Sequence, residues 1–287
     1  MAKFMLLIFV FLNAMLFAKP IVVVSIPPEK TFVQKIAKEN LEIIVMAEAG
    51  SSPHSYEPKA SQMVALSKAV LYLSIGVEFE NAWLERFKSQ NKNLKFVDIS
   101  ANISKMNMQE QHHHEDESHE EEHHDHNGLD PHTWTSPKNV AVMAEAIYKA
   151  LLELDPQNKE FYKSNLDDFL KEIQETDMQI KSALKDVSPK SKFMVFHPSW
   201  GYFAHDYDLV QVAVEVEGKN PTPKEMITII EEVKEEHVKV IFAQPEFSDK
   251  SAQIIAKEAQ ASVHKISPLD INWSQNLINM AKAIANK

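Results

Sequence analysis

The sequence contains no cysteine, has only five glycines among its 287 residues, and carries no excess of positive charge. Without cysteine the chain can form no disulfide, no thiolate metal site and no lipid anchor attached through sulfur. No predicted strand is followed by a glycine-rich phosphate loop, which argues against dinucleotide binding. A formal net charge of −11 provides no basic face for nucleic acid, and we expect no such partner.

Long apolar runs are also missing, apart from a short one near the start. Phe4 to Leu12 is apolar, Lys3 precedes it, and the segment from Ala14 to Ala18 offers a small side chain at each end for cleavage. This layout is typical of a secretory signal, and the run is shorter than the ~20 residues that span a bilayer. We therefore expect a signal peptide at residues 1–18 and an exported, periplasmic protein that is neither integral to the membrane nor a lipoprotein.

The negative charge is concentrated in one segment. Eight of the 41 acidic residues lie between Glu110 and Asp125, which leaves 33 acidic against 30 basic residues elsewhere. This composition cannot bury enough apolar surface to fold, so residues 109–128 are predicted to form a flexible loop. We expect either weak metal contact at several sites or a dispensable solvated insert. The candidate ligands of this loop are His112, His113, His114, His119, His123, His124 and His126.

One short pattern inside this loop has a second interpretation. His119 to His123 satisfies the His-Glu-x-x-His pattern of zinc metalloproteases. That pattern requires a packed helix to aim both rings at one ion, and no apolar face accompanies it here. In a tract made of His and Glu a chance match is expected, and we do not predict a protease.

The rest of the chain alternates between short apolar runs and helical patterns, once before and once after a helical middle. This β/α alternation predicts an α/β fold with two lobes, each built on a parallel-type sheet, at residues 19–154 and 188–287. The predicted strands are 21–25, 42–47, 69–75 and 94–99 in the first lobe, and 192–197, 209–214, 238–243 and 262–266 in the second.

The middle of the chain predicts two helices. Ser136 and Pro137 suit the N-cap and first position of a helix ending near Leu154, and Asp155 with Pro156 suit the start of another. The second helix, within residues 155–187, has apolar residues at helical spacing and no Gly or Pro between Pro156 and Asp186. We expect it to be one long rigid helix that joins the lobes and limits hinge closure.

Three histidines outside the acidic segment lie beside proline in predicted turns: His54 in Pro-His-Ser, His132 in Pro-His-Thr, and His197 in Phe-His-Pro. Proline restricts the backbone next to it, so each imidazole can be presented in one position. Neutral imidazoles are good zinc ligands. A single histidine in such a turn is more often a hydrogen-bonded structural residue than a metal ligand, and only the three matching settings together point to a site.

These motifs resemble those of the solute-binding proteins that serve zinc and manganese ABC transporters, and most closely the zinc-uptake receptors. The similar stretches are 50–58, 130–134 and Phe196-His197, and the likeness covers essentially the whole mature chain. The resemblance implies metal in the cleft between two α/β lobes, with His54, His132 and His197 as ligands. It also implies a permease with its cytoplasmic ATPase as the partner; we expect a monomer and no enzyme activity.

The third ligand favours zinc, bound as transported cargo. Manganese receptors of this family typically have a carboxylate where this chain has His197, and imidazole suits zinc better. The resemblance also suggests Asp270 as a fourth ligand, although Asp270 could instead cap the last helix, and water could fill that position. Glu57 is expected to orient the ligands as an outer-shell carboxylate, and Trp134 to wall the cleft.

Three other functions remain open at this point. A manganese or other divalent-metal receptor of the same family would use the same ligands. A zinc hydrolase would need an open coordination position and measurable turnover. A periplasmic zinc-buffering or storage protein would bind many ions without one dominant site.

Overall fold

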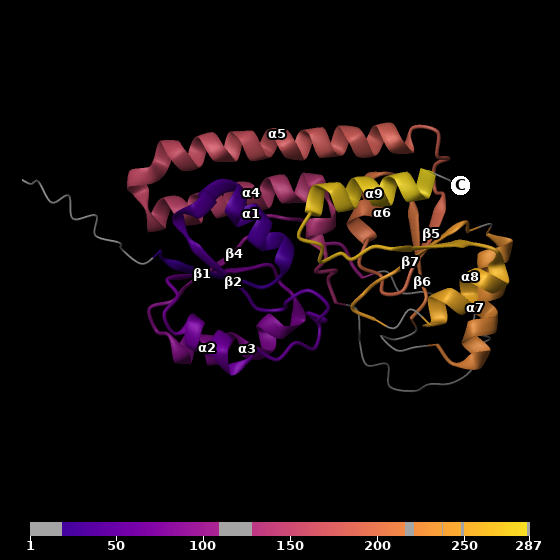
Figure 1. Ribbon diagram of the computed structural model, residues 1–287, viewed down its shortest axis with the longest axis horizontal. Helices are drawn as coiled ribbons and strands as arrows, with labels where there is room; N and C mark the ends of the chain where they lie inside the picture. Colours follow the sequence, from indigo (N-terminus) through magenta and orange to yellow (C-terminus); the bar gives the residue numbers. More distant parts are fainter. Residues whose placement is uncertain (1–18, 109–127, 216–220, 237, 248–249, 286–287) are drawn as a thin grey trace, which may run out of the picture.

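The computed structural model describes residues 19–108, 128–215, 221–236, 238–247 and 250–285. These residues form two α/β lobes that stand side by side beneath one long helix (Figure 1). The signal peptide expected at 1–18, and the loop with its histidines from His112 to His126, lie outside the described residues.

The N-terminal lobe is built on a four-stranded parallel sheet in the order β2-β1-β3-β4. Its two central strands, β1 and β3, are mostly buried, as expected of a parallel sheet with helices on both faces, whereas the edge strands β2 and β4 are partly exposed. Helix α1 lies on the side nearer the long helix, and α2 and α3 lie on the opposite side (Figure 1). The elements are β1 (Ile21–Val24), α1 (Pro27–Ala37), η1 (Lys38–Asn40), β2 (Glu42–Val45), α2 (Ala60–Leu66), β3 (Leu71–Ser74), α3 (Glu78–Gln90) and β4 (Lys95–Asp98).

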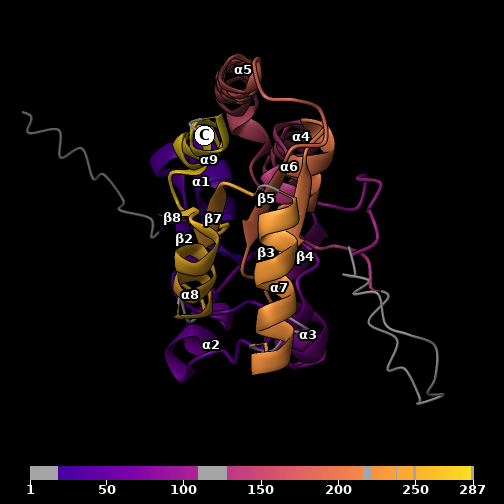
Figure 2. The ribbon, with the colours of Figure 1, turned by 90° about the vertical axis from the view of Figure 1, so that its right-hand side faces the viewer.

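The C-terminal lobe repeats this topology with a parallel sheet in the order β6-β5-β7-β8. The two sheets therefore have the same strand order, and the predicted fold class is confirmed. Figure 2 shows α7 and α8 side by side at the far end of this lobe. The elements are β5 (Lys192–Val195), α6 (Gly201–Asp206), β6 (Val210–Ala213), α7 (Pro223–Glu235), β7 (Val240–Ala243), α8 (Lys250–Ala259), β8 (Ser262–Lys265) and α9 (Trp273–Ala285).

Between the lobes the chain forms η2 (Thr133–Thr135), α4 (Pro137–Leu154), η3 (Pro156–Asn158) and α5 (Lys159–Leu184). The predicted N-cap of α4 is present, since Ser136 Oγ accepts the amide of Asn139 at 3.2 Å. Helix α5 has 26 residues, which corresponds to ~39 Å. It runs over both lobes (Figure 1).

The start of the long helix differs from the prediction. Residues 156–158 form a 3₁₀ turn, and the α-helix begins only at Lys159. The Asp155 carboxylate accepts hydrogen bonds from Asn158 Nδ2 at 2.6 Å and Tyr162 Oη at 3.0 Å, which holds this turn in its tighter form. The short helices α2 and α6 were not predicted, because six or seven residues give too little apolar periodicity to recognise.

One continuous apolar core connects the lobes under the helical layer. It includes strand residues of both sheets, such as Val24 and Phe242, together with Phe169 of α5 and Leu277 of α9. A smaller core lies on the other face of the C-terminal sheet, under α7 and α8. The lobes are thus held together by packing as well as by the helix, whereas the proposed domain boundaries stay predictions.

Among the described residues, no helix combines the length and apolar character that a membrane span requires.

Candidate metal-binding site

Three imidazoles from distant parts of the chain meet between the lobes. His54 lies in the loop after β2, His132 directly precedes η2, and His197 lies two residues after β5. One ring nitrogen of each lies within 4.8 Å of the others, and the ring centroids are 4.4 to 5.4 Å apart. Ligands in open α/β sheets typically bind beyond the carboxyl ends of strands, where His54 and His197 are found.

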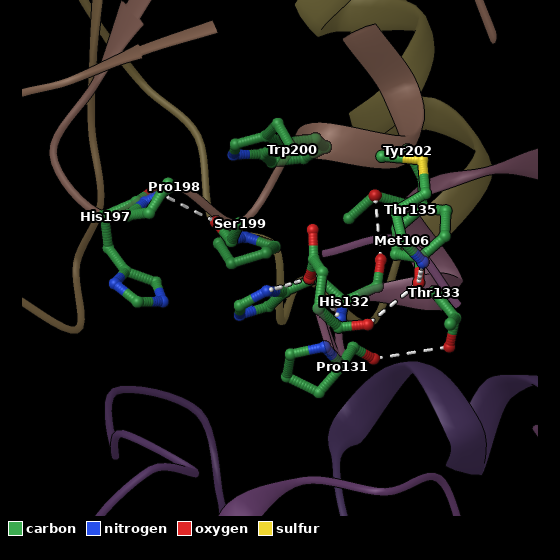
Figure 3. A network of polar contacts seen from close by, with 12 residues as sticks. Met106, Pro131, His132, Thr133, Thr135, His197, Pro198, Ser199, Trp200 and Tyr202 are labelled. Carbon is green, nitrogen blue, oxygen red and sulfur yellow. Dashed lines mark hydrogen bonds and ion pairs between the residues drawn. The ribbon is translucent and has the colours of Figure 1, made fainter. Parts of the chain in front are cut away.

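Each imidazole is paired with a carboxylate through its Nδ1 atom. His54 Nδ1 lies 2.9 Å from Glu78, His132 Nδ1 lies 2.7 Å from Asp130, and His197 Nδ1 lies 2.6 Å from Glu215. Figure 3 shows His132 and His197 with the contacts that hold their loops. An ionised carboxylate can only accept, so each Nδ1 carries the proton and each Nε2 keeps a free lone pair.

The electrostatics around His197 favour a neutral imidazole that can bind a cation. Burial, reinforced by the nearby His132 and His54, lowers the pKa of His197 despite its hydrogen bond to Glu215. Burial alone would raise the pKa of Glu78, but the hydrogen bond from His54 lowers this pKa to about 2. His197 Nε2 is buried and has no hydrogen-bond partner among the described residues.

Two of the three carboxylates are buried as well. The side chains of Asp130 and Glu215 are 1% and 7% exposed, and Asp130 Oδ2 and Glu215 Oε2 find no hydrogen-bond partner in the described parts of the chain. Buried charges without compensation are costly. A divalent cation held by the imidazoles would balance these two negative charges.

Polar contacts fix the backbone around two of the imidazoles. Gln244 Oε1 accepts the amide of His197 at 2.6 Å, and its Nε2 donates to the His197 carbonyl at 3.1 Å. On the other side, Asp130 Oδ1 accepts the amide of His132 at 2.9 Å, and Tyr202 Oη donates to the Asp130 carbonyl at 2.8 Å. The rings are therefore pre-organised by neighbours on both lobes.

The space that the imidazoles enclose is very small, about 10 Å³. Apolar side chains complete its wall, including Val77, Phe247 and Leu269, and Glu246 also lines it. This volume is close to the minimum for one water-sized body. It suits a single ion and excludes an organic solute.

The remaining predicted residues lie at different distances from this centre. Trp134 lines the cavity, with its ring centroid 5.3 Å from that of His132, and its Nε1 donates to Pro268. Glu57 is exposed, and the carboxylate expected there to orient His54 is provided by Glu78 instead.

Asp270 is not part of the three-histidine group. It lines an adjoining groove, and its Oδ1 accepts the amide of Asn272 at 2.7 Å. The last helix begins at Trp273, so Asp270 is not its N-cap either. A fourth-ligand role for Asp270 stays a prediction, and it would require movement of the loop after β8.

The sequence analysis missed Glu78, Glu215 and Gln244, and gave Asp130 no role of its own. Glu215 comes directly after the predicted strand 209–214, and Gln244 comes directly after the predicted strand 238–243. Polar residues at that position in a parallel sheet are a usable signal for a site at its edge.

The chain is similar to proteins of known family and known structure. Residues 22–287 match the sequence model of the family described as ZnuA, zinc-uptake complex component A, periplasmic. A crystal structure of ZnuA is similar to this chain with a TM-score of 0.84 and 39% identity, over 94% of this chain and 99% of that one. A ZnuA deletion mutant with zinc bound gives 0.83 and 38%, over 94% and 98%.

A sequence relative with a zinc-binding name is more distant. The zinc-binding protein AdcA of Streptococcus pyogenes serotype M3 is 27% identical over 260 residues, which cover 87% of this chain. The match covers 50% of AdcA, so this chain spans about half the length of that relative.

Proposed function

The chain belongs to the family of the periplasmic component A of zinc-uptake complexes, and from this premise we propose that it is a zinc receptor. It binds one Zn²⁺ with His54, His132 and His197, and delivers the ion to the permease of an ABC-type importer. It acts in the periplasm as a monomer, after removal of residues 1–18. The observation that carries the proposal is the convergence of three imidazoles, each with its Nδ1 held by a carboxylate.

The donor set supports zinc over manganese as cargo. Three imidazole nitrogens suit zinc, whereas manganese prefers carboxylate and water oxygen. The nearest carboxylates, Glu78, Asp130 and Glu215, face Nδ1 atoms and polarise the imidazoles. Such outer-shell pairs orient zinc-binding histidines and raise their basicity.

The size of the cavity supports binding rather than catalysis. About 10 Å³ leaves room for the ion but not for a peptide or ester within the cavity itself. A zinc hydrolase would also need a fourth position open to substrate. Storage of many ions does not require one pre-organised site of this kind.

Calorimetry with a competing chelator tests the proposal. Wild-type protein should show one tight zinc site, and His54→Ala, His132→Ala and His197→Ala should each weaken it by more than the ~10–100-fold typical of outer-shell changes. His205→Ala is the matched control, because this side chain is 70% exposed and lies outside the group. Tight binding that survives all three alanine substitutions together would contradict the proposal.

A further inference from the structure

A second, larger space adjoins the metal cavity. This interlobe groove has a volume of about 410 Å³ and is lined from both lobes, by Lys30, Glu48 and Gly50 on one side and by Ser267 and Asp270 on the other. Two residues, Glu246 and Leu269, line both the groove and the small cavity. Glu246 is the charged side chain on this shared wall.

The two oxygens of Glu246 have different surroundings. Ser267 Oγ donates to Oε1, and Ser267 is itself held, since its Oγ accepts the Leu269 amide at 3.0 Å and its carbonyl accepts Asn276 Nδ2 at 2.7 Å. Oε2 is buried and finds no hydrogen-bond partner among the described residues. Burial, with the charge of Asp270 adding to it, raises the pKa of this carboxyl. One oxygen is thus anchored and the other remains available.

Glu246 lines the cavity without belonging to the ligand group at its centre. That group holds the three imidazoles within 4.8 Å of one another and includes no carboxylate of the described residues. Direct zinc–oxygen ligation requires ~2.0–2.2 Å. The anchored carboxylate therefore lies beside the imidazoles rather than among them.

A cation passing from the groove to the imidazoles meets an unfavourable step. It must give up water, and much of the cavity wall is apolar, as at Val77, Phe247 and Leu269. Moving an ion into such surroundings is costly unless an opposite charge accompanies it. Glu246 supplies a negative charge at this place, and the buried, unpaired Nε2 of His197 lies on the wall of the same cavity.

We propose that Glu246 is a relay ligand, which binds the cation through Oε2 at the mouth of the cavity and passes it to the three histidines. This inference rests on the proposed zinc-binding function. Glu246 then sets how fast the ion is captured, whereas the three imidazoles mainly determine the affinity of the final complex.

Stopped-flow mixing with Zn²⁺ tests the relay, with the fluorescence of Trp134 as a probe because its ring lies beside His132. The variant is Glu246→Gln, which has the same shape and can still accept from Ser267. Glu48→Gln is the matched control: it removes a charge from the same groove, but this carboxylate is exposed and paired with Lys59 at 2.7 Å. Both variants are measured at pH 8 and checked for the wild-type unfolding temperature.

In Glu246→Gln the association rate constant should fall about tenfold or more, the scale of local electrostatic enhancement of on-rates. The dissociation rate constant should fall as well, because a residue that lowers the barrier to entry also lowers the barrier to exit, and Glu48→Gln should keep wild-type association. The proposal is overturned if neither rate changes, if most of the lost affinity lies in faster dissociation, or if Glu48→Gln slows association equally. These failures leave tight zinc binding by the wild type intact, so they are distinct from failure of the proposed function.

Discussion

Gly201, the first residue of α6, allows the carboxylate of Asp130 to approach the backbone closely. A Cβ atom at this position would lie 2.7 Å from Asp130 Oδ2, whereas ordinary contact begins at 3.4 Å. In Gly201→Ala the carboxylate must therefore move by about 0.7 Å, or the start of α6 must shift by a similar amount. Asp130 is the residue that fixes the ring of His132, so the displacement reaches the metal site.

The size of the effect follows from the hydrogen bond that would be lost. Asp130 Oδ1 lies 2.7 Å from His132 Nδ1, and lengthening by about 0.7 Å would exceed the normal range of ~2.7–3.2 Å. Loss of such an outer-shell partner costs ~10–100-fold in metal affinity, or about 1.4–2.8 kcal/mol. We expect zinc affinity of Gly201→Ala to fall by that factor.

The metal-free protein should lose only part of its stability. Crowding at the buried Gly201 costs ~1–3 kcal/mol, and the preference of a helix for alanine over glycine offsets up to ~0.5–1 kcal/mol of it, so the free energy of unfolding should fall by no more than about 2.5 kcal/mol. Competition calorimetry gives the affinity, and urea unfolding of the metal-free protein gives the stability. A weaker site in a protein that stays fully folded under the assay conditions separates the specific effect from general damage.

A double-mutant cycle tests whether the effect passes through Asp130. In an Asp130→Ala background the new methyl group finds space, so Gly201→Ala should cause no further loss of zinc affinity. Wild-type affinity in the single variant would refute the reasoning. An equal loss in the Asp130→Ala background would refute it as well.

Two further predictions concern the buried acid Glu80 and the acidic segment 109–127. Burial raises the pKa of Glu80 from 4.5 to about 7, so between these values the folded state holds a proton that the unfolded state lacks. The free energy of unfolding should therefore fall by up to about 3 kcal/mol as the pH rises from 5 to 8. Urea unfolding at a series of pH values should show a smaller fall for Glu80→Gln. The same dependence on pH in the variant and the wild type would refute this prediction. Replacing 109–127 by a two-residue turn should leave the tight zinc site unchanged in calorimetry, because the Met108 amide already donates to Gly128 at 3.1 Å; its loss would contradict this.

Most of the fold could be predicted because its signals are local. Buried parallel strands appear as short apolar runs, and the predicted ranges for all eight overlap the observed strands. The Ser136-Pro137 start of α4 is a local capping signal and was placed correctly. The helices α2 and α6 could not be predicted because they are too short to show a period. Helix propensity disfavours the glycine at position 201, but a side chain there would collide with Asp130.

The imidazoles of the site could be predicted, but their carboxylate partners could not. His54, His132 and His197 stand in recognisable Pro-flanked turns. The partner of His197 is determined by strand register: β5 and β6 pair Val195 with Ala213, which brings residues 197 and 215 opposite each other just beyond the strands. The sequence predicts Glu57, which is close to His54 along the chain, whereas the fold brings Glu78 at the start of α3 to that ring.

The metal site is assembled from three separate parts of the molecule, and the fold must hold these parts in fixed positions to form so small a cavity. The N-terminal lobe provides the pair His54 and Glu78, the segment before α4 provides Asp130 and His132, and the C-terminal lobe provides His197 and Glu215. Three rings can be held close enough for one ion only if these parts keep fixed positions. The apolar core that continues from one lobe to the other under α5 and α9 keeps them fixed.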